Sequence, residues 1–62
     1  ESDKFIKSVR KRLQSGRIAI FNRLYYGEKR PQAMHFARKL ETFFPKVDYV
    51  YPEANLMLVC YN

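Results

Sequence analysis

The run LMLVCY, from Leu56 to Tyr61, is the longest unbroken apolar stretch of this 62-residue chain and decides its fold. A strand that is apolar at almost every position is typical of the centre of a sheet. A membrane-spanning helix needs about 20 apolar residues, so this run is far too short to cross a bilayer. We therefore expect a central strand here and no membrane partner.

Upstream of this run, the apolar spacing predicts two helices. Phe5, Ile6, Val9 and Leu13 recur at helical intervals and predict a basic amphipathic helix over about residues 3–15. Gly16 suits the left-handed C′ position that ends such a helix.

The second helix is expected to begin with Pro31 at its first position, after a loop over residues 27–30. Its wide apolar stripe makes it the main core helix, and it runs to about Phe44, where Pro45 stops it.

Two more strands complete the pattern. Residues 17–26 are rich in β-branched and aromatic side chains, and residues 46–51 form a strand joined to the last one by a turn at 52–55. The expected fold is a single small basic α+β domain over residues 1–62, of order αβαββ. We expect a three-stranded mixed sheet of order 1-3-2, in which the last strand is antiparallel to both others, with both helices on one face.

The strand over 17–26 presents two sets of side chains, one on each face, by alternation. The first set is expected to meet the core: Ile18, Ile20, Asn22, Leu24 and Tyr26. The second set mixes guanidinium groups with aromatic rings, as surfaces that stack bases do: Arg17, Ala19, Phe21, Arg23 and Tyr25. The alternative is that Phe21 and Tyr25 pack under the first helix or at a dimer seam.

The other face of the sheet is left exposed or is buried by dimerisation. Its candidate residues are Tyr25, Tyr49, Tyr51 and Tyr61.

Positive charge is concentrated in the first half of the chain. The formal net charge is +6, and residues 1–30 carry all of this excess. Clustered cations attract polyanions, although the same pattern is also found on merely solvated helix faces.

Residues for chemistry are sparse. The chain has one histidine, one cysteine and two glycines, which leaves no metal-ligand cluster, nucleophile–base pair or phosphate-binding loop. We expect a non-catalytic protein without metal or cofactor, in which His35 is a solvated surface residue and Cys60 a small buried one. A free thiol without disulfides favours the cytoplasm.

These observations favour a nucleic-acid-binding module, for DNA or RNA, which carries no RNP1 or helix-turn-helix signature. The alternative is a regulator or inhibitor that docks on an acidic protein through its basic helix and exposed Tyr and Arg residues. Small size also favours a homodimer. The candidate binding residues are Lys4, Lys7, Arg10, Lys11, Arg12, Arg17, Arg23, Tyr25, Lys29 and Arg30.

Overall fold

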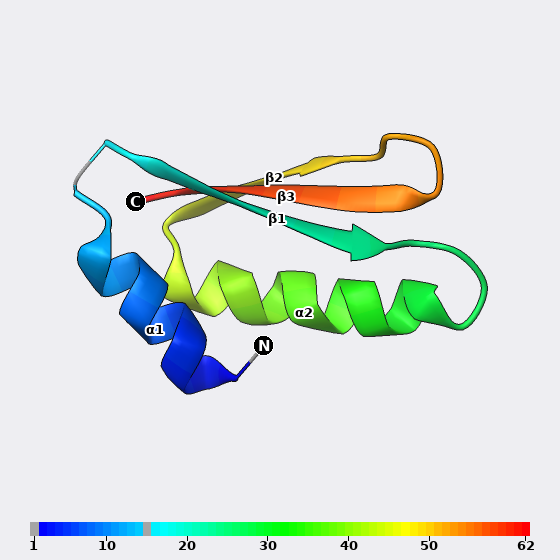
Figure 1. The fold of residues 1–62 in the computed structure, drawn as a ribbon, viewed down its shortest axis with the longest axis horizontal. Helices are drawn as coiled ribbons and strands as arrows, with labels where there is room; N and C mark the ends of the chain where they lie inside the picture. Colours follow the sequence, from blue (N-terminus) through cyan, green and yellow to red (C-terminus); the bar gives the residue numbers. More distant parts are fainter. Residues whose placement is uncertain (1, 15) are drawn as a thin grey trace.

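Two helices and three strands follow one another in the predicted order αβαββ in the computed structural model, which describes residues 2–14 and 16–62. The elements are α1 (Asp3–Arg12), β1 (Ile18–Leu24), α2 (Lys29–Phe43), β2 (Lys46–Val50) and β3 (Asn55–Tyr61). Figure 1 shows the strands as one layer and both helices as a second layer beneath it.

The apolar strand β3 lies at the centre of the sheet, as its sequence predicts. The strand order is β1-β3-β2, and β3 is antiparallel to both neighbours. The sheet is therefore antiparallel at every hydrogen-bonded pair. The predicted mixed character is limited to β1 and β2, which run in the same direction but are not neighbours in the sheet.

The end of α1, the start of α2 and the place of Gly16 differ from the prediction. The first helix ends at Arg12, because the following Leu13 is extended (φ −79°, ψ 130°). Gly16 has a positive φ of +86°, but it lies in the loop before β1 and is not the residue that ends the helix. The second helix begins at Lys29, so Pro31 falls in its first turn, where a missing backbone N–H removes no helical hydrogen bond.

The core lies between the sheet and the helices. Leu56, Leu58 and Cys60 alternate along β3 and point to the helices. They pack with buried residues of both helices and with Phe44, which follows α2. The helix residues are Ile6, Ala33, Phe36, Ala37 and Leu40. Cys60 is fully buried, which confirms its predicted place as a small apolar residue.

The prediction for the two faces of β1 was wrong. Ile18, Ile20 and Leu24 are 46%, 57% and 50% exposed, whereas Phe21 is half-buried against the core. The Phe21 ring packs edge-on against Phe36 of α2, with centroids 5.6 Å apart. Both sets of β1 side chains contain large apolar residues, and on the helix side the Phe21 ring fills the space above α2.

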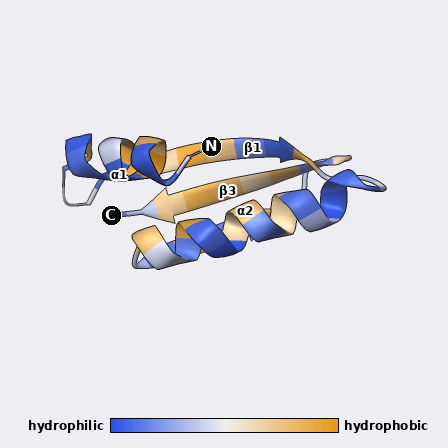
Figure 2. Ribbon diagram, turned by 90° about the horizontal axis from the view of Figure 1, so that it is seen from below, coloured by the Kyte–Doolittle hydropathy of each residue, from blue (hydrophilic) through white to orange (hydrophobic). Residues whose placement is uncertain are grey.

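The face of the sheet opposite the helices carries no covering element among the described residues. Figure 2, seen from the helix side, places both helices in front of the strands. Of the four tyrosines predicted for the uncovered face, only Tyr61 lies there, paired across the ladder with Ile18 and Lys46. Tyr25 and Tyr49 pack against the core instead, and Tyr51 follows β2 and packs against Tyr25. Neither helix of the described chain is long and apolar enough to span a membrane.

Candidate nucleic-acid interface

The basic side chains of α1 point away from the core, because the helix is amphipathic and its apolar side packs inward. Ile6 is its one fully buried residue in the described chain, Val9 and Leu13 are half-buried, and Phe5 remains 47% exposed. The cations on the remaining surface are all exposed: Lys4, Lys7, Arg10, Lys11 and Arg12. The α1 part of the predicted site is therefore presented to solvent as one cluster.

Both ends of α1 are fixed by specific contacts. Ser2 caps the start, where its Oγ accepts a hydrogen bond from the Phe5 N–H at 3.2 Å. Asp3 also forms a salt bridge of 3.0 Å with Lys39 of α2.

Asn62 anchors the other end of α1. Its side-chain amide donates to the carbonyl oxygens of Leu13 at 2.8 Å and Arg10 at 3.4 Å. The Leu13 carbonyl is one that the end of a helix leaves unpaired, whereas the Arg10 carbonyl also accepts from the Leu13 N–H at 3.2 Å. Asn62 therefore positions the last turn of α1, where the basic residues are densest.

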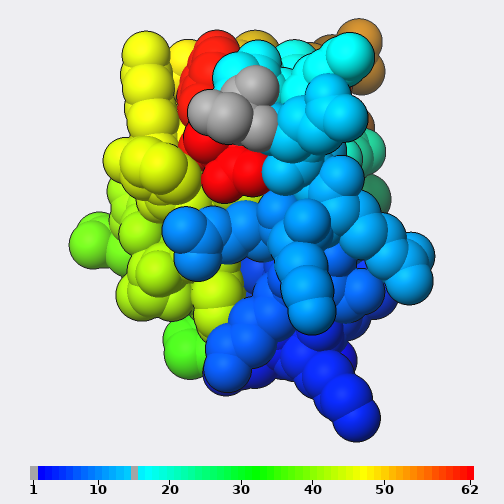
Figure 3. Space-filling model, turned by 90° about the vertical axis from the view of Figure 1, so that its left-hand side faces the viewer, coloured from blue at the N-terminus to red at the C-terminus, as the bar shows by residue number. Residues whose placement is uncertain are grey.

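A hollow of about 710 Å³, here called the α1 groove, lies between α1 and the end of α2. Figure 3 looks onto this end of the molecule, where α1 (blue), the end of α2 (yellow-green) and the C-terminal residues (red) meet. The groove is lined by Lys7, Arg10, Lys11, Leu13, Thr42, Phe43 and Asn62.

The α1 groove is strongly electropositive. Three of its lining residues are cations, none is acidic, and within the described chain no salt bridge neutralises Lys7, Arg10 or Lys11. The Lys7 ammonium lies 6.0 Å from the centre of the Phe43 ring, which keeps the lysine stem over the groove. The Thr42 hydroxyl donates to the Lys39 carbonyl at 2.6 Å, so its oxygen keeps acceptor capacity.

Arg17 lies at the same end of the molecule as the α1 groove. Its backbone N–H donates to the Gln14 carbonyl at 3.0 Å, and its carbonyl accepts from the Asn62 N–H at 3.1 Å. These bonds hold the start of β1 against the end of α1. The exposed Arg17 side chain therefore adds a cation to this end of the molecule, outside the lining of the groove.

The remaining predicted residues lie elsewhere. β1 runs away from α1, so Tyr25, Lys29 and Arg30 lie at the opposite end of a molecule whose longest dimension is 35 Å (Figure 1). There the Tyr25 and Tyr51 rings pack with centroids 5.4 Å apart, and the Arg30 guanidinium lies 5.5 Å from the Tyr25 ring. The expected continuous footprint is therefore divided into two basic regions.

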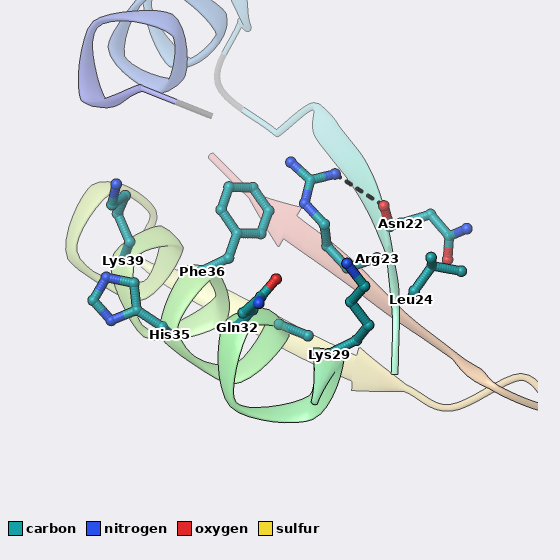
Figure 4. Close-up of a pocket in the computed structure, with 9 residues that line it drawn as sticks. Asn22, Arg23, Leu24, Lys29, Gln32, His35, Phe36 and Lys39 are labelled. Carbon is teal, nitrogen blue, oxygen red and sulfur yellow. Dashed lines mark hydrogen bonds between the residues drawn. The ribbon is translucent and has the colours of Figure 1, made fainter. Parts of the chain in front are cut away.

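Arg23 lines a second hollow, of about 450 Å³, between β1 and α2. Its guanidinium stacks 4.0 Å from the Phe36 ring and donates to the Asn22 carbonyl at 2.9 Å (Figure 4). The predicted outward row of alternating arginines and rings is thus wrong, because Phe21, Arg23 and Tyr25 face the helix layer. An arginine is accommodated there because this hollow opens to solvent beside α2.

Further residues of both hollows had no signal in the sequence. Thr42, Phe43 and Asn62 complete the α1 groove, and Gln32, His35 and Lys39 line the second hollow (Figure 4). Only the tertiary structure joins them, although His35 is exposed as predicted. Among residues 2–14 and 16–62, no group of three His, Cys, Asp or Glu side chains is placed to hold a metal ion.

Comparison with protein families, with curated proteins and with solved structures found no match for this chain.

Proposed function

We propose that the protein is a non-catalytic nucleic-acid-binding module of the cytoplasm, which holds the phosphate backbone of DNA or RNA against α1. The observation that supports this most is the α1 groove, whose lining has three cations and no acidic side chain. A phosphate chain supplies the regularly spaced negative charge that such a groove attracts.

The chemistry of the groove suits phosphate contacts more than base reading. Lysine and arginine donate to phosphate oxygens from a range of directions, and Asn62 and Thr42 add polar groups beside them. Exposed cations at both ends of the same helix, Lys4 and Arg12, continue the surface beyond the groove. Affinity then comes mainly from the release of counterions.

The first experiment is fluorescence anisotropy with labelled single-stranded DNA, duplex DNA and RNA, each titrated over a salt series. If about six phosphates are neutralised, log K falls with log salt at a slope near −5 for duplex DNA. We expect binding that persists at physiological salt with a preference among the three probes. A flat salt response, or binding that vanishes at physiological salt without preference, contradicts the proposal.

A pair of variants places the site. Arg10→Ala removes a cation of the α1 groove and is expected to lower affinity for every probe about tenfold while reducing the salt slope by about 1. The matched control is Arg38→Ala, which removes an exposed cation of α2 that lies outside the groove, near Tyr49. Equal losses in the two variants would mean that the charge acts only as a general attraction.

A second candidate function is docking on an acidic protein, and the aromatic group at the far end favours it. The Tyr51 ring is 52% exposed and packs beside Tyr25, which Arg30 overlies. Tyr and Arg are the residues that most often anchor protein interfaces. In that case Tyr51→Ala reduces capture of the partner more than Arg10→Ala does, whereas the nucleic-acid function gives the opposite order.

A further inference from the structure

The uncovered face of the sheet is largely apolar along β1 and β3, and β2 adds Val50 to it. It is called the open face here and consists of Ile18, Ile20, Asn22, Leu24, Lys46, Asp48, Val50, Asn55, Met57, Val59 and Tyr61. Ile20 is 57% and Val50 47% exposed, and Met57 and Val59 lie half-buried between them. A sheet face in contact with water is normally polar, whereas most of the residues that β1 and β3 present here are apolar.

The central strand β3 shows these outward-facing apolar residues most clearly. Along β3, Leu56, Leu58 and Cys60 face the helices, while Met57 and Val59 face the open side. A strand that is apolar on both faces is characteristic of a sheet covered on both faces. The second covering layer is absent from the described chain.

The open face carries almost no net charge. Of the charged residues in the three strands, only Lys46 and Asp48 lie on it, because Arg23 faces α2. Asp48 accepts a hydrogen bond from the Tyr61 hydroxyl at 2.9 Å, and the Lys46 ammonium lies 5.0 Å from the Tyr61 ring. The net charge of +6 therefore resides on other surfaces.

We infer that the open face is covered by the open face of a second copy of this chain, which gives a symmetric face-to-face dimer. An acidic partner would be drawn to α1, on the other side of the sheet, whereas a neutral apolar face suits another neutral apolar face. Two antiparallel sheets pack in this way about 10 Å apart, with their side chains interdigitated. Both α1 helices then lie on the outside, where their like charges are far apart.

The size of the face fits a weak dimer. The two longest strands have seven residues each. At about 3.3 Å per residue and 4.8 Å per strand, the three strands outline roughly 330 Å², and the relief of the projecting side chains raises the accessible area to roughly 500 Å². Two copies thus bury about 1,000 Å² in total, at the lower limit for a specific interface. We expect association in the micromolar range.

Sedimentation equilibrium over a concentration series, without nucleic acid, tests the dimer independently of the proposed function. The wild type is expected to rise from the monomer mass to twice that mass, while Ile20→Lys stays at the monomer mass at every concentration. Because the Ile20 side chain is exposed and outside the core, this variant keeps the wild-type far-UV circular dichroism. The control is Gln32→Lys, which adds the same charge on exposed α2 and is expected to dimerise.

Two results would overturn the inference. One is a wild type that remains monomeric up to millimolar concentration, and the other is an Ile20→Lys variant that dimerises as the wild type does. NMR spectra of the wild type on dilution give a second measurement that needs no variant. Resonances of Ile18, Met57 and Val59 are expected to move with concentration, and shifts confined to α1 would contradict the open-face dimer.

Discussion

At the scale of single residues, the clearest environment is that of the thiol in β3. Cys60 is fully buried between the sheet and α2, and this burial raises its pKa from 9.0 to about 11. The neutral thiol is therefore the form that the folded protein retains. Such a cysteine is also a poor nucleophile, because the reactive thiolate is suppressed.

Cys60 makes stability fall at alkaline pH. A pKa that is higher in the folded state contributes stability that is complete below pH 9.0 and is lost as the pH rises to about 11. This loss is about 2 to 3 kcal/mol at the top of the range. Denaturant unfolding of the wild type and of Cys60→Ala over this range measures it.

The variant is expected to lose less stability with rising pH than the wild type. Tyr49, whose pKa is raised by burial and then by Glu41, titrates in both proteins and cancels in the comparison. Tyr61, whose pKa is raised chiefly by its hydrogen bond to Asp48, cancels in the same way. Parallel pH profiles for the two proteins would show that Cys60 is not the source of the alkaline loss of stability.

At the scale of elements, β3 separates core packing from the open face. Leu58 is fully buried against the helices, whereas its neighbour Val59 points to the open side and is half-buried. Both residues are aliphatic and lie in the same strand. Truncation to alanine therefore compares the two faces within one strand.

Leu58→Ala is expected to lower the free energy of unfolding of the monomer by about 2 to 5 kcal/mol, because it leaves a cavity in the core. Val59→Ala is expected to lower it by about 1 kcal/mol or less, since less contact is lost at an open surface. Urea unfolding at a concentration low enough to keep the protein monomeric checks both values. Similar losses in the two variants would contradict the burial of Leu58 against the helices and the place of Val59 on the open face.

At the scale of the whole molecule, the important fact is the distance between the two basic regions. The α1 groove lies at one end and Lys29 and Arg30 at the other, along a longest dimension of 35 Å (Figure 1). Duplex DNA rises 3.4 Å per base pair, so about 10 base pairs are needed to span both regions. Ligand length therefore decides which cations take part in binding.

Under the proposed function, a duplex of about half that length, held together as the stem of a hairpin, contacts the α1 groove alone. The double variant Lys7→Ala, Lys11→Ala is expected to weaken its binding, and the double variant Lys29→Ala, Arg30→Ala to leave it nearly unchanged. With a duplex of about 20 base pairs both double variants weaken binding. Anisotropy at fixed salt measures this, and an equal effect of both variants on the short duplex would contradict the division into two regions.

The sequence by itself determined the helices and strands, the order αβαββ, the central place of β3 and the burial of Cys60. These follow from local periodicity and from the one long apolar run, which short stretches of chain carry without reference to their neighbours. The basic outer surface of α1 was predictable for the same reason.

Only the tertiary structure decided which side of β1 faces the helices, because both sets contain large apolar side chains and the choice depends on how Phe21 fits against Phe36. It also decided which cations share a surface. β1 carries Tyr25 and the start of α2 away from α1, while Thr42 and Asn62, distant in sequence, complete the α1 groove.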